Sequence, residues 1–469
     1  MAAGAPKKVR NDLKLPTDGH SETPGSPRPL EPKSRLQSFQ SWLRRYWIPV
    51  VLVAAALAMC GAVTVQHSQS FSPLDEWVYY DYVLKIPTQG VVHQGEFLGE
   101  PALEAMACFG DGFGPRGEPC TGPHGDYDEP AAYPQQGKTS VDLYTPLYFA
   151  FTWATGKAVQ FLTGFDFLTA ARLTGFFWLA GGVIAFYALA MRLRLNKIVT
   201  LGLGLTVIGL PASRYAFTYI TTDAPSFFFG SLLLLLAVRF VRGNLRHPWW
   251  LILVAALAVL VKITNLFALG LMVVFLLVYA MTAWRKGAPP RYRAVSPRRI
   301  ITVASLSVAT AVLAEIVWLG IRVAIRVGDG PDQGVASPFS IRRVAGSVAT
   351  FIGVPYPNTV DSALSLPYAL IYIAGVFGFF LSARGFGMKR ALSISTAVSV
   401  TLFPPLLLMA MSVALGSAFP IAARYGASLM PAAFVGVAMI TRNQLSRYLL
   451  LVYGAVLVIT AIARSFYLS

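Results

Sequence analysis

Long apolar runs constrain the fold of this chain more than any other feature of its sequence. They lie near residues 46–66, 166–191, 197–212, 224–241, 248–262, 264–284, 300–321, 366–383, 391–413, 421–440 and 446–465. Inside a bilayer an α-helix satisfies its own backbone N–H and C=O groups, so apolar runs of this kind form helices. Because 55% of the residues are hydrophobic and only 13% are charged, we predict an all-α polytopic membrane protein with about 11 transmembrane helices.

The basic residues predict the orientation of these helices. The formal net charge of +17 is compatible with nucleic-acid binding, but Lys and Arg fall in short clusters between the apolar runs, as in cytoplasmic turns. Two such clusters are Arg192, Arg194 and Lys197, and Arg239, Arg242 and Arg246. We therefore expect no nucleic-acid partner, a cytoplasmic N-terminus and a location in the plasma membrane.

The first 45 residues differ in composition from the rest of the chain. They are basic, contain several Pro and Ser and show no apolar periodicity, so they bury too little surface to fold alone. We predict a disordered cytosolic tail over 1–45 and one transmembrane domain over 46–469.

A long polar segment, 67–165, follows the first apolar run and is predicted to lie outside the cytoplasm. It contains about half of the 22 Asp and Glu residues and begins with the adjacent pair Asp75 and Glu76. Within it, 143–163 is apolar enough to cross, but a crossing there would turn the Arg192 cluster to the outside. We therefore expect 143–163 to lie along the outer interface.

Several aromatic residues of this loop are typical of the headgroup region. They are Tyr79, Tyr82, Tyr144, Tyr148 and Trp153. Tyr and Trp combine an apolar ring with a polar tip, so they favour the membrane–water interface. Trp77, beside the acidic pair, is expected instead to offer its ring to a sugar.

The same loop holds two of the three cysteines. Cys108 and Cys120 are separated by a stretch rich in Gly and Pro that lets the chain turn back. An extracytoplasmic position favours a disulfide between them, and two free thiols are the alternative. Cys60, inside the first apolar run, is expected to be only a small apolar residue.

Motifs for nucleotide hydrolysis and for zinc binding are missing from the sequence, which has no Gly-x-x-x-x-Gly-Lys-Ser/Thr phosphate loop, no Cys-x-x-Cys and no His-Glu-x-x-His. What remains is a set of ionisable residues at membrane depth or at the outer ends of the apolar runs. They are Asp75, Glu76, Arg172, Asp223, Lys262, Glu315 and Arg424. Such groups are costly in hydrocarbon and face a cavity or a partner. The alternative to a functional role is an internal salt bridge for Arg172 and for Glu315. For Asp75 and Glu76 the alternative is that they form the solvated start of the loop.

These features together resemble the GT-C superfamily of integral-membrane glycosyltransferases. The likeness covers most of 46–440 and rests on three short motifs. They are Asp75-Glu76 before a long outer loop, Tyr219-Ile220-Thr221-Thr222-Asp223 with a Lys-x-Thr-Asn element at Lys262, and Arg424-Tyr425 followed by Pro431. The chain departs from well-known branches, since it has no large soluble C-terminal domain and no clear Asp-x-Asp early in the first loop.

The resemblance implies an inverting transfer of a sugar from a polyprenyl-phosphate donor to a glycan, lipid or protein acceptor of the cell envelope. By this likeness Asp75 is the general base, with Glu76 positioning or sharing the acceptor, and Tyr425 and Asp223 contact substrate with Trp77. Lys262 and Arg424 are expected to bind the donor phosphate, with Arg172 and Arg214 behind them. No cofactor or metal site is assigned, although a divalent cation is compatible with the chemistry.

Two other classes of protein fit the same sequence. A secondary transporter or flippase for an envelope precursor also places rare charges at depth, although this chain shows no internal repeat. A non-catalytic envelope-assembly protein that keeps the fold is the third reading, and activity alone separates it from an enzyme.

Overall fold

A computed structural model describes residues 35–68, 70–72, 75–109, 133–284, 294–331, 338–352, 359–385, 387–415 and 421–467. Secondary structure in these ranges is helical, apart from one isolated antiparallel β-bridge between Phe97 and Lys138. The chain divides into two units, Met1–Trp47 and Ile48–Ser469. The first unit contributes the beginning of helix α1, and the second holds the remainder of that helix and every other element.

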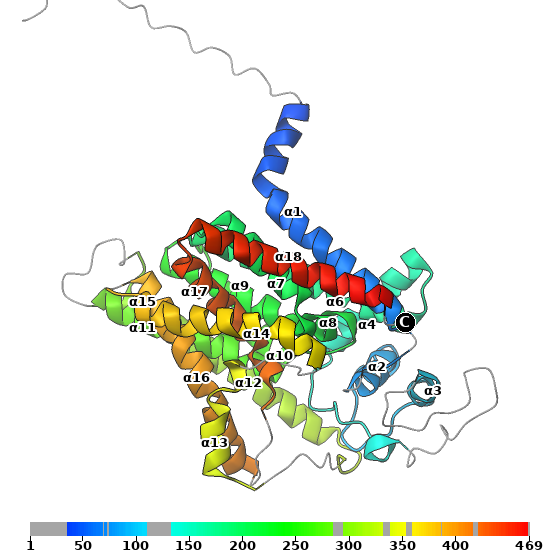
Figure 1. Ribbon diagram of the computed structural model, residues 1–469. Coiled ribbons are helices and arrows are strands. Elements are labelled where there is room, and N and C mark those ends of the chain that lie inside the picture. Colours follow the sequence, from blue (N-terminus) through cyan, green and yellow to red (C-terminus); the bar gives the residue numbers. More distant parts are fainter. Residues whose placement is uncertain are drawn as a thin grey trace, which may run out of the picture. The chain divides into compact units, whose positions relative to one another are not determined.

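The helices follow the apolar runs of the sequence (Figure 1). The α-helices are α1 (Arg35–Gln66), α2 (Glu76–Lys85), α3 (Glu100–Phe109), α4 (Leu147–Thr163), α5 (Phe167–Arg172), α6 (Gly175–Arg192), α7 (Lys197–Gly209), α8 (Pro211–Thr218), α9 (Pro225–Val241), α10 (Trp249–Val261), α11 (Leu266–Trp284), α12 (Pro297–Ala324), α13 (Ile341–Ser347), α14 (Thr359–Ile373), α15 (Phe379–Ser382), α16 (Met388–Leu415), α17 (Met430–Ile440) and α18 (Gln444–Tyr467). Shorter 3-10 segments are η3 (Pro134–Gly137), η4 (Ile263–Asn265), η6 (Thr350–Ile352) and η8 (Ala423–Leu429), and η7 (Ala374–Gly378) is a π-helical turn.

Length and hydropathy identify this chain as a polytopic membrane protein. Among the described residues, seven helical segments are long and apolar enough to cross a membrane, and eight if the bent pair α7 and α8 counts as one crossing. Three shorter apolar helices, Pro225–Val241, Trp249–Val261 and Leu366–Ser382, match three further apolar runs. Helix α4, with 17 residues, is not among these segments, and the placement of 143–163 along the interface stays a prediction.

The crossing predicted over 197–212 is interrupted. Helix α7 ends at Gly209, α8 begins at Pro211, and their axes differ by 64°. Pro211 cannot donate a backbone hydrogen bond to the preceding turn, so it ends one helix and occupies the first turn of the next. As a result, much of the outer turn expected over 213–223 is helical.

Helix α1 begins at Arg35, within the tail predicted over 1–45. Residues 1–34, the remainder of that predicted tail, lie outside the described residues.

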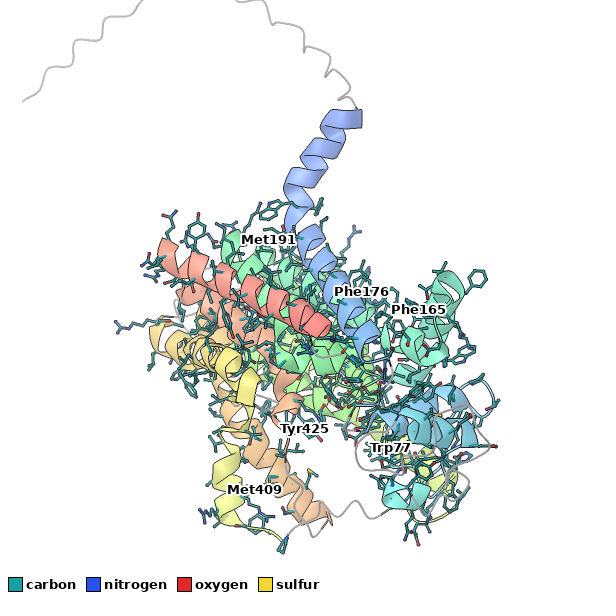
Figure 2. The ribbon with its side chains drawn as sticks, turned by 45° about the vertical axis from the view of Figure 1, so that its right-hand side comes forward. Trp77, Phe165, Phe176, Met191, Met409 and Tyr425 are labelled. Carbon is teal, nitrogen blue, oxygen red and sulfur yellow. The ribbon has the colours of Figure 1, made fainter. Side chains whose placement is uncertain are left out.

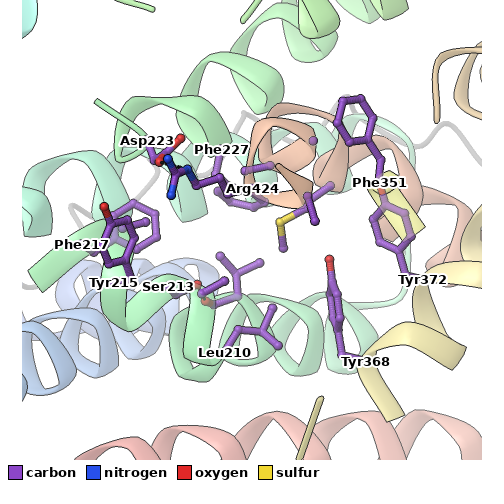
Figure 3. Close-up of a pocket in the computed structure, with 17 residues that line it drawn as sticks. Leu210, Ser213, Tyr215, Phe217, Asp223, Phe227, Phe351, Tyr368, Tyr372 and Arg424 are labelled. Carbon is purple, nitrogen blue, oxygen red and sulfur yellow. Dashed lines mark hydrogen bonds and ion pairs between the residues drawn. The ribbon is translucent and has the colours of Figure 1, made fainter. Parts of the chain in front are cut away.

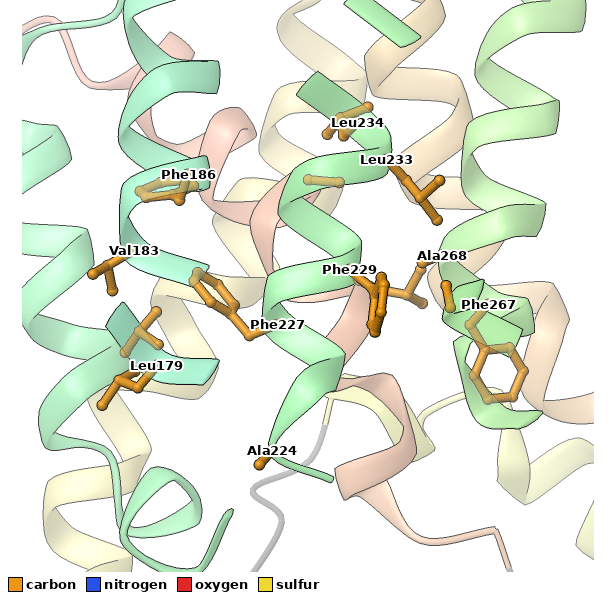
Figure 4. Packing of buried hydrophobic residues seen from close by; sticks show 14 of the residues in the cluster. Leu179, Val183, Phe186, Ala224, Phe227, Phe229, Leu233, Leu234, Phe267 and Ala268 are labelled. Atoms are coloured by element: carbon orange, nitrogen blue, oxygen red, sulfur yellow. The ribbon is translucent and has the colours of Figure 1, made fainter. Parts of the chain in front are cut away.

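Helix α9 occupies the centre of the second unit. It packs against α6 on one side and α11 on the other. Phe227 meets Phe186 of α6, with ring centroids 6.0 Å apart, and Phe229 faces Ala268 of α11 (Figure 4). Between membrane helices the driving force is close packing rather than escape from water, so the fit of these side chains determines how the helices sit.

Glycines allow the closest helix approaches. A Cβ on Gly230 of α9 would lie 2.0 Å from the carbonyl oxygen of Ser428 in η8, so only glycine permits this contact. Gly202 of α7 similarly faces the backbone of Leu450 in α18, where an added Cβ would lie 2.8 Å away. The Gly-x-Gly at 202–204 therefore contributes to helix packing.

Candidate functional site

Asp223 and Lys262 form the buried centre of the candidate site. Asp223 is 5% exposed, Lys262 is 2% exposed, and the Lys262 ammonium donates to Asp223 Oδ1. Asp223 lies just before α9 and Lys262 caps the C-terminal end of α10. Each charge thus complements the dipole of its helix. Burial lowers the pKa of Lys262 below its ordinary value, and the facing Asp223 carboxylate partly offsets that shift.

Arg424 connects this pair to Asp75. Its Nε lies 3.4 Å from Asp223 Oδ2 and its Nη2 lies 3.7 Å from Asp75 Oδ2. Asp75 is 44% exposed, whereas Arg424 is 19% exposed. The order Asp75–Arg424–Asp223–Lys262, which we call the ionic chain, therefore runs from an open carboxylate to a buried ammonium.

Aromatic rings flank the ionic chain. The centroid of the Tyr425 ring lies 5.5 Å from Lys262 Nζ and 5.6 Å from the Arg424 guanidinium carbon. Tyr215 lies 6.0 Å from the same guanidinium. Ring faces attract cations at these separations, so the tyrosines hold the basic side chains in place while their hydroxyl groups remain hydrogen-bonding groups.

The helices present these residues at one set of ends and basic clusters at the other. Asp223 precedes α9 and Arg239 ends it, and Lys262 follows α10 while Arg246 precedes it. Arg424 likewise precedes α17, and Arg442 follows it. The ionic chain thus lies at the ends of these helices opposite to those that carry the basic residues.

A cavity extends from the ionic chain into the apolar interior. Asp223 and Arg424 lie at one end, and Tyr368 and Tyr372 of α14 lie at the other (Figure 3). Most of the remaining lining is apolar, contributed by α7, α8, α9, η6 and η8. The volume is ≈ 50 Å³, enough for a few heavy atoms and too small for a sugar. Entry of a larger group requires a lining side chain to rotate, and the flexible Met430 is suited to this.

Glu76 and Arg172 lie outside the ionic chain and pair with each other. Both side chains are 0% exposed, and Arg172 Nε donates to Glu76 Oε1 over 2.8 Å. Arg172 therefore has the internal salt bridge that was the alternative to phosphate binding, and Glu76 is closed to an acceptor. Glu315, by contrast, forms no ion pair within the described part of the chain and is half-buried on α12.

Arg214 and Trp77 were also expected at the site. The charge of Arg214 acts on His67 and Tyr219. Burial, with the nearby charges of Arg172 and Arg214, lowers the pKa of His67 to about 3, so that this histidine is neutral near pH 7. Trp77 is 6% exposed and packs in the core, whereas Tyr425 extends from η8 beside the ionic chain (Figure 2).

Three tyrosines expected at the membrane interface are part of the protein interior. Tyr79 is 4% exposed, Tyr82 is 0% exposed and stacks on Phe149 with centroids 4.0 Å apart, and Tyr148 is 2% exposed. The Tyr148 hydroxyl accepts a hydrogen bond from the Thr221 backbone N–H at 3.0 Å. The expectation of an interfacial belt was wrong for these residues because their polar tips find partners inside the protein. Tyr79 follows Asp75 by one helical turn, and this spacing would have pointed to the site.

Two further expectations concern cysteines and metals. Cys108, in α3, is disulfide-bonded, and Cys60 is a buried free thiol. Cys120, the expected partner, lies outside the described residues, so the pairing stays a prediction. Within the described ranges, no three His, Cys, Asp or Glu side chains converge as a metal-binding group.

No protein-family model, curated protein or solved structure matches this chain. Only the site itself therefore indicates the function of this chain.

Proposed function

We propose that this chain is a membrane glycosyltransferase with the GT-C architecture, which transfers a sugar from a polyprenyl-phosphate donor to a cell-envelope acceptor. The observation that carries the proposal is the ionic chain at the mouth of an apolar cavity. It offers two cations for a phosphate and one open carboxylate for a proton. The apolar surroundings suit the isoprenoid part of a lipid donor.

The helix ends support an extracytoplasmic reaction in the plasma membrane. If the bent pair and the three shorter apolar helices all cross, the seven long spans become eleven crossings. In that order of crossings the basic turns lie on the same side as the N-terminus, and the positive-inside rule favours the cytoplasm for that side, so that the ionic chain opens to the other side. The donor's prenyl chain then stays in the bilayer while its headgroup reaches Arg424.

The proposed reaction is a single displacement at the anomeric carbon. The acceptor hydroxyl oxygen bonds to that carbon as the bond from carbon to the phosphate oxygen breaks, and Asp75 accepts the hydroxyl proton. General-base catalysis of this kind contributes about 10²–10⁴-fold. Arg424 and Lys262 stabilise the negative charge that develops on the departing phosphate, and a water-poor site strengthens this effect. Because the attack comes from the side opposite the phosphate, the configuration inverts.

Tyr425 and Tyr79 are proposed to orient the sugar. Tyr425 contacts both cations of the ionic chain, so its hydroxyl lies where the headgroup would enter. Tyr79 lies close enough to Asp75 for the carboxylate charge to act on the Tyr79 hydroxyl. Phenolic hydroxyls can donate to and accept from sugar hydroxyls.

Transport of a lipid-linked precursor is the second candidate. The 64° break between α7 and α8 beside the cavity favours it, because transporters build substrate sites at interrupted helices. A transporter moves its substrate across the bilayer unchanged, whereas a transferase releases polyprenyl phosphate.

One experiment tests the proposal directly. Purified protein is incubated with a cell-envelope fraction as the source of acceptor hydroxyls and with polyprenyl-phosphate arabinofuranose, polyprenyl-phosphate mannose or related donors, with and without EDTA, and released polyprenyl phosphate is measured. Asp75→Asn is expected to abolish release, and Glu104→Gln, an exposed carboxylate on α3 of the same loop, is expected to leave it unchanged. The EDTA arm reports a divalent cation.

Near-normal turnover of Asp75→Asn would remove the proposed base. Absence of release from every donor, together with movement of a labelled lipid donor across liposomes that contain the protein, would favour transport.

A further inference from the structure

Glu76 binds four hydrogen-bond donors and so connects separate parts of the chain. Oε1 accepts from Arg172 Nε at 2.8 Å and from the Ile220 backbone N–H at 2.9 Å. Oε2 accepts from Arg172 Nη2 and from the Ser72 backbone N–H, both at 2.8 Å. The two carboxylate oxygens thus tie α2 to α5, to the end of the first span and to the turn before α9.

Arg172 extends the same network toward α1. Its Nη1 donates to the His67 carbonyl oxygen at 2.9 Å and its Nη2 donates to the Ser70 carbonyl oxygen at 2.6 Å. Neither side chain is exposed, so substrate cannot reach them. The hydrogen-bonding groups of both side chains bind partners inside the protein.

The hydrogen bonds of Glu76 and Arg172 reach backbone groups that lie next to the residues of the proposed reaction. Asp75 directly precedes Glu76, and Ile220 stands three residues before Asp223 in a tight turn that the Thr221 side chain closes with the Asp223 N–H at 3.3 Å. The pair therefore fixes the backbone at Asp75 and the backbone just before Asp223 relative to each other.

We propose that Glu76 and Arg172 form a positioning pair that sets the place of Asp75 relative to Asp223, Lys262 and Arg424. This inference deepens the proposed function and rests on it. An isolated buried ion pair can often be replaced by apolar residues without loss. Here the pair also satisfies four backbone groups from two segments, the stretch after α1 and the turn before α9, which an apolar replacement cannot do.

Asp81 supplies a matched control on the same helix. It is 1% exposed, it pairs with Lys85 at 2.9 Å, and it accepts from the Gly99 N–H at 2.8 Å. Asp81→Asn and Glu76→Gln each remove one buried charge of α2, and each thereby weakens the contacts of that side chain with one cation and with backbone N–H groups. Both variants are expected to lose thermal stability.

Only Glu76→Gln is expected to lose turnover. Since displacement of a reacting group by about 1 Å can cost 10²-fold, we expect kcat to fall by about 100-fold while Asp81→Asn stays within about threefold. The donor KM of Glu76→Gln should change by less than about threefold, because Lys262 and Arg424 lie on elements that the pair does not hold. An unchanged kcat for Glu76→Gln would overturn the proposal.

An exchanged pair separates positioning from simple charge neutralisation. In Glu76→Arg with Arg172→Glu, the ion pair can reform, but an arginine faces the Ser72 and Ile220 N–H groups and a carboxylate faces the His67 and Ser70 carbonyls. Positioning predicts no recovery of kcat over the Glu76→Gln variant. Recovery to within tenfold of the wild-type protein would contradict it.

Hydrogen–deuterium exchange gives a measurement that does not depend on activity. Glu76→Gln should speed exchange of the Ile220 and Ser72 amides, and Asp81→Asn should leave both unchanged. Unchanged exchange at Ile220 in Glu76→Gln would sink the inference even if transfer is robust. If no donor is consumed by the wild-type protein but exchange at Ile220 accelerates as expected, the proposed function fails while the link between these segments stands.

Discussion

Gly230→Ala tests whether the crossing of α9 and η8 places Arg424. The added Cβ would lie 2.0 Å from the Ser428 carbonyl oxygen. Carbon and oxygen approach in proteins to about 3.3 Å, so the two segments would separate by roughly 1.3 Å. Overpacking of this kind costs about 1–3 kcal/mol of stability. Arg424 lies on the same η8 segment as Ser428, so its guanidinium moves with it.

The assay compares thermal unfolding in detergent with donor turnover. A shift of about 1 Å at a binding group is expected to lower kcat/KM by about 10²-fold. Gly320→Ala is the matched control, because Gly320 lies in α12 with no heavy atom within 4 Å of the position of an added Cβ. There the alanine should be neutral or stabilising by up to about 1 kcal/mol. If Gly230→Ala matches Gly320→Ala in both measurements, the close crossing does not position Arg424.

Three further predictions concern charge and redox state. Lys262→Met leaves Asp223 buried without its ammonium and should destabilise the protein by about 3–5 kcal/mol; adding Asp223→Asn should restore part of that loss in thermal unfolding, and an additive double variant would contradict the pairing. Arg424→Ala should raise the donor KM at least about tenfold, with partial recovery in Arg424→Lys, since lysine keeps the charge but lacks the guanidinium fork; equal KM values in all three proteins would exclude Arg424 from the phosphate site. Cys108 and Cys120 should resist alkylation until reduced, and ready labelling in intact cells would refute the disulfide.

The helix positions were largely predictable from the sequence. The run expected over 264–284 corresponds to the segment Ile263–Trp284, and the run over 46–66 to Tyr46–Gln66. Apolar runs predict helices well because an unsatisfied backbone group in hydrocarbon costs several kcal/mol wherever the run occurs. The proline at 211 indicated that a helix could end there. The angle between α7 and α8 could not be predicted, because it depends on the side chains that pack around the break.

The meeting of Asp223, Lys262 and Arg424 also followed from a general rule, because rare charges at the ends of apolar runs need partners. The rule does not say which partner each charge takes. Arg172 was expected near a phosphate and instead binds Glu76. That choice depends on the rotation of α2 and α5 about their own axes, which side-chain packing determines. For the same reason Tyr148 was predicted at the membrane interface, whereas its hydroxyl is bonded to Thr221 inside the protein.

The ionic chain has a consequence for how anions compete at the site. The charges of its two basic side chains and two carboxylates cancel, so the ionic chain has no net charge. If Arg424 binds the donor phosphate as proposed, that phosphate displaces Asp75 from Arg424. Asp75 then competes with every anion that binds there, including the polyprenyl phosphate that the proposed reaction releases. Asp75→Asn removes this competing carboxylate. The variant should therefore bind polyprenyl phosphate more tightly, even though it cannot complete a catalytic cycle.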